Sequence, residues 1–226
     1  MKDVILKLPN RAPLEIKFVK ESSREATLSN MQALVIESNY GFNDLGIYTK
    51  YISKAMDIDE DLFRKYADSL MKEDLPTIDV IPTQNPLSRL KAVALVSSPN
   101  CDCYKAFESN GVRPSKDFFY NIVYEALSAL IRMNFKNIGI AGLTGSLRFV
   151  NDSQYRNAVA EAVCHAASDF PSLEKIQVIS FGPLISNGVE YFNQFPQEAS
   201  QHRTIPTVER DLYGFKRITL NIPRRF

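Results

Sequence analysis

Helical segments alternate with short apolar runs through the second half of the sequence, and this order leaves few folds open. After residue 115, apolar side chains recur at helical spacing in two adjacent rows, which predicts one long helix packed against a sheet. The first row holds Phe118, Ile122, Ala126 and Leu130, and the second holds Phe119, Val123, Leu127 and Ile131. An apolar run at 138–141, a second helix from about Asp152 and a strand at 176–181 complete the series. We therefore expect right-handed crossovers and a three-layer α/β/α sandwich around a mixed, largely parallel sheet.

The first half of the sequence predicts the remaining strands and two more helices. Residues 4–8 and 14–19 are β-rich segments on either side of a turn with two prolines, which is typical of an N-terminal hairpin. Residues 33–36 form a short apolar run that predicts a buried strand, and residues 78–81 and 92–96 predict two others. Helical spacing of apolar residues predicts helices at 44–55 and 59–71. We expect the side chains of Asp57 and Asp59 to cap the second of these helices.

The sequence pattern divides the chain into one domain and an extension. Residues 1–182 carry the strand and helix signals, and we expect them to form a single α/β domain. Beyond residue 182 the pattern weakens, although 184–195 fits a short helix and 215–222 alternates like a strand. We expect residues 183–226 to be a C-terminal extension packed on the same domain.

Charge and hydropathy bear on partners and location. The sequence holds 27 basic and 26 acidic residues, a formal net charge of +1, so it lacks the overall positive field that concentrates a polyanion. Extensive nucleic-acid binding is therefore disfavoured. The first residues become polar too early for a signal peptide, and no apolar run approaches the ~20 residues of a membrane-spanning helix. We expect a cytoplasmic protein with no membrane partner.

Residues that commonly carry catalysis or bind metals are sparse. The three cysteines, Cys101, Cys103 and Cys164, are expected to be free thiols, because adjacent-but-one cysteines seldom form a relaxed disulfide. We expect no metal and no cofactor, since the cysteine spacing differs from that of a zinc knuckle. His165 lies among apolar residues of a predicted helix, which favours a structural role over that of a general base. The sequence supports no Ser/His/Asp or Cys/His arrangement for nucleophilic catalysis.

Two glycine-bearing loops follow predicted strands, at the sheet edge where ligands bind in open α/β folds. The first loop carries Gly41 and Gly46, and the second carries Gly142 and Gly145. Glycines let backbone amides approach an anion, and the helix after each loop adds a favourable dipole for phosphate. The two loops therefore fit a diphosphate cradle. They also fit simple tight strand-to-helix turns, which isolated glycines form more often.

Several segments between residues 17 and 181 match one known family in the same order. Residues 33–39, Ala-Leu-Val-Ile-Glu-Ser-Asn, are similar to a strand that ends in Asn-Ala-Ala-Asn, and residues 44–47, Asp-Leu-Gly-Ile, take the place of a Gly-Gly-Gly-Val phosphate loop. Residues 93–99 are similar to a strand of the type Val-Ile-His-Thr-Val-Gly-Pro. Residues 141–146, Ala-Gly-Leu-Thr-Gly-Ser, match a second phosphate loop, usually Ile-Ser-Thr-Gly-Ile. By these segments the chain resembles the macro domains, which bind ADP-ribose and its derivatives.

The resemblance implies a ligand site and its residues. The implied ligand-binding residues are Asn39, Gly46, Ile47, Leu143, Thr144, Gly145, Ser146, Leu147 and Phe181. Their loop amides would hold a diphosphate, and Phe181 would lie against the adenosine. The acidic residue with which the family often reads adenine has Ser22 as its best match here, with Glu21 or Asn30 as substitutes.

The leading hypothesis is binding of ADP-ribose or a related nucleotide, free or on an ADP-ribosylated protein, with weak or no ADP-ribosyl hydrolase activity. Hydrolysis ranks below binding because the motif's first Asn, which contacts the distal ribose in active relatives, is Ile36 here. The first alternative is a non-enzymatic protein or RNA interaction module that keeps the fold without the ligand. Its RNA contact would be the basic C-terminal end, with Lys216, Arg217, Arg224 and Arg225. The second alternative is a nucleoside- or peptide-processing enzyme on another α/β scaffold.

Overall fold

The computed structural model describes most of the predicted elements. The described residues are 3–8, 11–20, 28, 30–37, 44–70, 77–97, 116–141, 153–180 and 216–219. The strands are β1 (Asp3–Leu6), β2 (Leu14–Lys20), β3 (Ala33–Glu37), β4 (Thr77–Pro82), β5 (Ala92–Ser97), β6 (Asn137–Ala141), β7 (Lys175–Ser180) and β8 (Lys216–Thr219). The helices are α2 (Asp44–Met56), α3 (Glu60–Leu70), α5 (Lys116–Arg132) and α7 (Ser153–Asp169). Over these residues, every helix is too short or too polar to cross a membrane.

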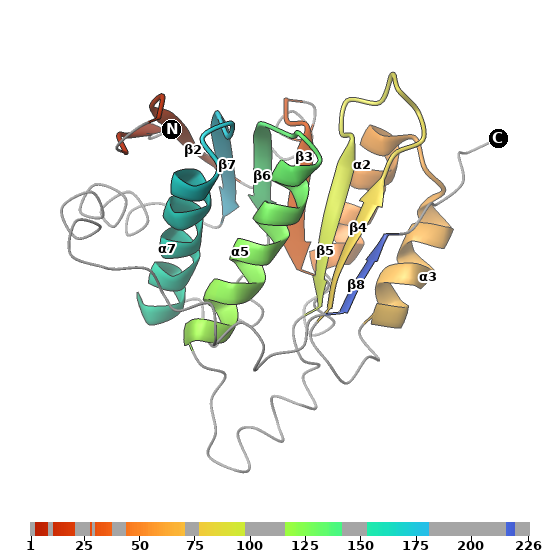
Figure 1. Ribbon diagram of the computed structural model, residues 1–226. Coiled ribbons are helices and arrows are strands. Elements are labelled where there is room, and N and C mark those ends of the chain that lie inside the picture. The colour runs from red at the N-terminus through yellow and green to blue at the C-terminus, as the bar shows by residue number, and fades with distance from the viewer. Residues whose placement is uncertain are drawn as a thin grey trace, which may run out of the picture.

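The described strands form one eight-stranded sheet in the order β1-β2-β7-β6-β3-β5-β4-β8 (Figure 1). Five neighbouring strands, β2, β7, β6, β3 and β5, run parallel to one another. β1 pairs antiparallel with β2 and β4 pairs antiparallel with β5, whereas β8 runs parallel to β4. The sheet is thus mixed and largely parallel, and it starts with the predicted hairpin.

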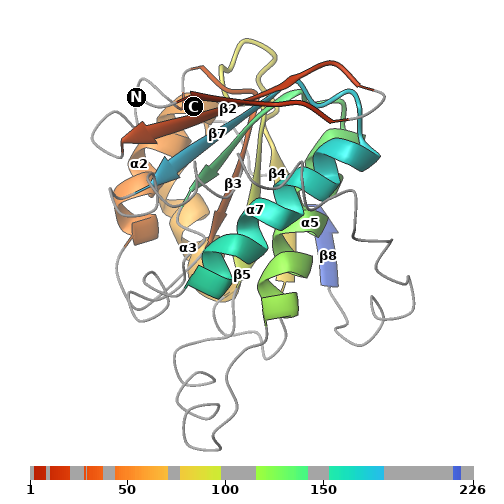
Figure 2. The same cartoon turned by 90° about the vertical axis from the view of Figure 1, so that its left-hand side faces the viewer.

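Helices cover both faces of this sheet (Figure 2). α5 and α7 pack against each other on one face, where α5 also contacts β3, β4 and β5. Their core includes Leu127, Val163 and Ile140, all buried. On the other face α2 and α3 bury Ile52 and Phe63 against the sheet. The observed architecture confirms the predicted three-layer α/β/α sandwich.

Residues 33–36 of the central strand β3 are all apolar because helices cover both faces of the sheet there. Alternate residues of a strand point to opposite faces of the sheet. Ala33 and Val35 belong to the core beneath α5 and α7, whereas Leu34 and Ile36 belong to the core beneath α2 and α3. All four are buried because helices cover both sides.

The loop between β4 and β5 closes the C-terminal end of α2. The last carbonyl groups of a helix have no partner within the helix. Here the carbonyl of Met56 accepts hydrogen bonds from the hydroxyl groups of Thr83, at 2.6 Å, and of Ser88, at 2.9 Å. The loop after β4 therefore holds the end of α2 against the edge of the sheet where β5 begins.

One of the two predicted caps of α3 is confirmed and the other is wrong. Oδ1 of Asp59 accepts a hydrogen bond of 2.8 Å from the backbone N–H of Leu62, as an N-cap does. Asp57 instead has a φ of 56° and accepts a 2.8 Å hydrogen bond from Nδ2 of Asn85. It serves the turn after α2, because an aspartate tolerates this left-handed conformation better than most residues.

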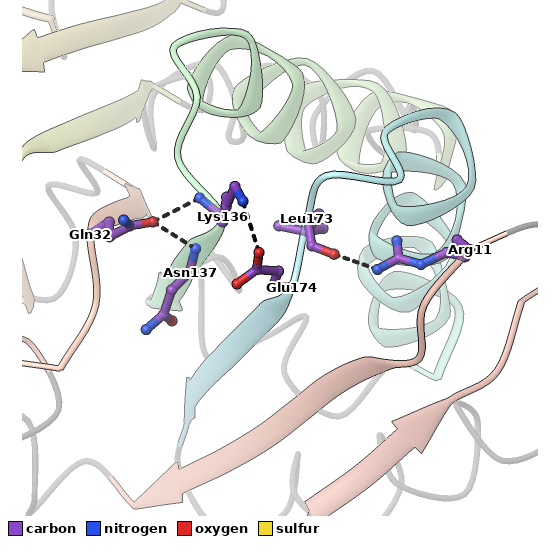
Figure 3. A network of polar contacts seen from close by, with 6 residues as sticks. All are labelled: Arg11, Gln32, Lys136, Asn137, Leu173 and Glu174. Atoms are coloured by element: carbon purple, nitrogen blue, oxygen red, sulfur yellow. Dashed lines mark hydrogen bonds and ion pairs between the residues drawn. The ribbon is translucent and has the colours of Figure 1, made fainter.

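Side-chain hydrogen bonds fasten the edge of the sheet where the parallel strands begin, which we call the amino edge (Figure 3). Oε1 of Gln32 accepts hydrogen bonds from the backbone N–H groups of Lys136 and Asn137, at 2.8 and 3.0 Å, just before and at the start of β6. The guanidinium of Arg11 donates to the carbonyl groups of Ala167 and Leu173. These bonds tie the N-terminal hairpin and the segment before β3 to the connections ahead of β6 and β7.

The C-terminal region contributes one described strand. β8 covers four of the residues predicted as a strand over 215–222, and it pairs with β4 from Thr77↔Lys216 to Val80↔Thr219. The short helix predicted at 184–195 lies outside the described residues. The division into a domain of residues 1–182 and an extension of residues 183–226 stays a prediction.

Candidate functional site

The candidate site lies at the opposite edge of the sheet, where the five parallel strands end, and which we call the carboxyl edge (the lower edge in Figure 1). The strand ends are aligned, because Lys20 pairs with Ser180 and Glu37 pairs with Val96. Ligands of open α/β sheets bind in the crevice beyond such ends. The strands that precede the two predicted glycine-bearing loops and Phe181, which are β3, β6 and β7, all end here.

Three helices also begin at the carboxyl edge. α5 and α7 end just before β6 and β7 begin, so their first residues, Lys116 and Ser153, lie at the far end, near the carboxyl edge. α2 ends at the amino edge beside Thr83, and its 13 residues extend about 20 Å back toward the carboxyl edge. The first N–H groups of a helix lack partners within the helix and attract anions. This edge therefore offers backbone donors from several directions.

The first predicted loop is described only in part. Asn39 lies outside the described residues, whereas Gly46 and Ile47 belong to the first turn of α2, which begins at Asp44. The backbone N–H groups at 44–47 are those that the helix itself leaves without acceptors. Gly46 and Ile47 thus lie in the N-terminal turn of the helix rather than in the loop before it.

The second predicted loop and the stacking aromatic lie outside the described residues. This holds for Leu143, Thr144, Gly145, Ser146 and Leu147, and for Phe181. The elements that flank them are described: β6 ends at Ala141, α7 begins at Ser153, and β7 ends at Ser180. The ligand roles of these residues therefore stay predictions.

A row of apolar side chains crosses the sheet directly beneath the carboxyl edge, on the face covered by α2. It consists of Ile179 on β7, Ala141 on β6, Ile36 on β3 and Leu95 on β5, which are register neighbours in that order. Each of them is at most 3% exposed. This apolar row offers a ligand no hydrogen-bonding side chain, so polar recognition at this edge falls to the loops and the helix N-termini.

One proposed substitute for the adenine-reading residue is placed elsewhere. The carbonyl of Asn30 accepts hydrogen bonds from Nδ2 of Asn137, at 2.7 Å, and from Nε2 of Gln177, at 3.1 Å. Asn137 is the first residue of β6, so Asn30 lies at the amino edge of the sheet. The prediction that Asn30 could read a base at the ligand edge is therefore wrong, and Glu21 lies outside the described residues.

The surroundings of the histidine and the cysteine in α7 indicate structural roles for both side chains. The hydroxyl of Tyr120 lies 2.7 Å from Nδ1 of His165, and the two rings meet edge to face. Cys164 is a buried free thiol, and its burial, together with the negative charge of Glu161, raises the pKa of the thiol well above its ordinary value. The thiol is therefore protonated and a weak nucleophile. Within the described ranges, no group of His, Cys, Asp or Glu residues could hold a metal ion.

Comparison with solved structures decides the fold family. A point mutant of the Oceanobacillus iheyensis macrodomain matches with 13% sequence identity and a TM-score of 0.59, over 88% of this chain and 100% of that chain. The same macrodomain with ADP matches with 12% identity and a TM-score of 0.55, over 86% and 97% of the two chains. This chain has the macrodomain fold. A scan against protein-family models and a search of the curated proteins find no match.

The macrodomain fold bears on the scaffold assumed in the second alternative. It excludes the alternative of an enzyme on another α/β scaffold, because the matched structures span nearly their whole length on this chain. It also confirms the resemblance found in residues 17–181. At these identities the likeness concerns the fold, so the ligand has to be argued from the chain's own residues.

Proposed function

We propose that this chain binds ADP-ribose or a related nucleotide at the carboxyl edge of its sheet. The observation that carries the proposal is the convergence, at one edge of a macrodomain fold, of five parallel strand ends and the N-termini of α2, α5 and α7. The first turn of α2, with Gly46 and Ile47, and the loop with Thr144 and Gly145 would hold the diphosphate through backbone N–H groups. The O. iheyensis macrodomain, similar in fold, has been solved with ADP.

Binding is proposed ahead of hydrolysis. Ile36, at the position of the family's ribose-contacting Asn, is 1% exposed and belongs to the core beneath α2 and α3. An alkyl side chain there can neither orient a ribose hydroxyl nor position a water molecule. Any hydrolysis would depend on a water molecule held by the ligand's own phosphate and the loop groups.

The test is a calorimetric titration of the purified protein with ADP-ribose, with AMP and NAD as comparison ligands. We expect micromolar binding of ADP-ribose. A Gly145→Glu variant is expected to lose it, because the added carboxylate would repel the diphosphate and the side chain would hinder the close approach of the backbone that the proposal requires. A matched control is Leu87→Glu, which adds the same charge at a side chain that is 88% exposed in the loop between β4 and β5, at the amino edge.

The control variant is expected to bind as the unmodified protein does. Equal loss in both variants would assign the effect to overall charge rather than to the loop. If the unmodified protein binds none of the three ligands, the nucleotide proposal is refuted. The non-enzymatic interaction module is then the hypothesis to test.

A further inference from the structure

The N-terminal strand β1 forms one end of the described sheet. It stands first in the strand order, and among the described strands it pairs with β2 alone. Every second residue of such an edge strand directs its backbone N–H and C=O groups away from the sheet, where a strand of another chain can pair with them. Proteins commonly protect an edge of this kind with charged side chains or a proline within the strand.

The side chain at the centre of β1 is apolar and exposed. Val4 and Leu6 are 5% and 0% exposed and belong to the core beneath α5 and α7, whereas Ile5 between them is 55% exposed. Ile5 lies on the other face of the sheet, because alternate residues of a strand point to opposite faces. Its register neighbour there is Glu15 of β2, whose carboxylate forms a 2.9 Å ion pair with Lys175 of β7. The centre of this edge strand therefore carries an isoleucine beside a polar surface.

The sequence of β1 is complementary to a second copy of itself in one antiparallel register. In that register a two-fold axis passes through Ile5, so that Ile5 stands opposite Ile5 of the second copy and Val4 stands opposite Leu6. Position 3, an aspartate, stands opposite position 7, a lysine, and the symmetry forms this pair twice. Opposite charges that face each other across two strands stabilise the pairing. A shift by two residues in either direction would break both pairs and place Ile5 opposite a charged residue, so the sequence favours this register.

We propose that β1 pairs with β1 of a second copy, so that two copies form a symmetric dimer with one continuous sheet. Main-chain hydrogen bonds hold the two strands together, and the contact between the Ile5 side chains and the two charge pairs select the partner. The contact involves one short strand of each copy, and interfaces below about 1,200 Å² are typical of weak complexes, so dimers form at high protein concentration. The dimer is independent of the proposed nucleotide binding, because residues 3–7 include none of the residues proposed to hold the ligand.

The experiment is analytical ultracentrifugation of the purified protein over a series of concentrations. We expect the unmodified protein to show a reversible equilibrium between monomer and dimer. Asp3→Lys and Lys7→Asp are each expected to weaken dimerisation about tenfold, because each variant replaces two attractive pairs with two repulsive ones. An equimolar mixture of the two variants is expected to dimerise as the unmodified protein does. In the mixed dimer the lysines at positions 3 and 7 of one copy stand opposite the aspartates at positions 7 and 3 of the other.

The recovery in the mixture separates an effect on the interface from an effect on folding, because a misfolded variant cannot be rescued by another. Lys65→Asp makes the same change of charge as Lys7→Asp at an exposed position of α3, and it is expected to dimerise as the unmodified protein does. A monomer at every concentration would overturn the inference. A dimer that both charge variants leave unchanged, or a mixture that fails to recover, would also overturn it, because the interface would then lie elsewhere. None of these outcomes bears on the titration with ADP-ribose.

Discussion

A single isosteric substitution in β7 tests the polar network that fixes the segment ahead of β3. Gln177 is 4% exposed, and its Nε2 donates hydrogen bonds to the carbonyl of Asn30, at 3.1 Å, and to Oδ1 of Asn137, at 2.9 Å. Both partners present oxygen atoms. Gln177→Glu keeps the size of the side chain but replaces the donating amide with an oxygen, so an ionised carboxylate would face two acceptors.

The loss in the free energy of unfolding of this variant is expected to depend on pH. The fold tolerates the protonated carboxyl better than the ionised one, so the loss is larger at high pH. A protonated carboxyl can donate only one of the two hydrogen bonds that the amide donates, which costs about 1 to 3 kcal/mol. Ionisation inside the fold is disfavoured by burial and by both oxygens, which raises the pKa of the introduced carboxyl and adds about 4 kcal/mol. Because the folded-state pKa lies above the unfolded value of about 4.3, this second cost is absent below that pH and grows as the pH rises.

The assay is urea denaturation followed by circular dichroism between pH 4 and pH 8. We expect the free energy of unfolding of Gln177→Glu to lie about 2 kcal/mol below that of the unmodified protein at pH 4, and about 6 kcal/mol below it at pH 8. Gln177→Met, which removes the donated hydrogen bonds without adding a charge, is the control and is expected to show a difference independent of pH. A difference for Gln177→Glu that stays flat across this range would refute the reasoning, because it would mean that water reaches the site.

Three other substitutions test packing, a buried hydrogen bond and a helix cap. Gly139→Ala places a Cβ atom 2.3 Å from Sδ of Met31, a residue that is 2% exposed, and urea denaturation is expected to show a loss of about 1 to 2 kcal/mol. Tyr66→Phe removes the hydroxyl that donates a 2.5 Å hydrogen bond to Oδ2 of the fully buried Asp79, with an expected loss of about 1 to 3 kcal/mol in thermal unfolding. Asp59→Ala removes the N-cap of α3 and is expected to cost about 1 kcal/mol without changing ADP-ribose affinity in a titration. An unchanged stability of any of these variants would contradict the contact on which its prediction rests.

The fold was predictable because its elements are set by periodic burial. The long helix α5 was found from two apolar rows, and Val123, Leu127 and Leu130 of those rows are indeed buried. The strand β3 was found from a run in which each residue meets one of the two cores. Such patterns repeat along the chain and therefore show in a single sequence.

The polar contacts between distant parts of the chain were not predictable, because nothing periodic marks them. Asp57 and Asp59 are alike in the sequence, yet only Asp59 caps α3, since Asp57 meets Asn85 from a loop 28 residues away. Asn30 was a candidate for base recognition, but its carbonyl meets the side chains of Asn137 and Gln177 at the amino edge. The partner in each case comes from a distant part of the chain, so the two meet only in the folded structure.

The difference between backbone and side-chain contacts explains how a ligand site could persist in this chain. The chain matches no family model, whereas its fold matches solved macrodomains. Backbone N–H groups at the start of a helix bind an anion whichever side chains surround them, so a diphosphate site made of them tolerates wide sequence change. Side-chain recognition lacks this tolerance. At position 36 an isoleucine fills the core between Ala141 and Leu95, where an amide would have to be satisfied without water. The proposed binding therefore rests on the backbone groups that the fold supplies and not on the side chain at position 36.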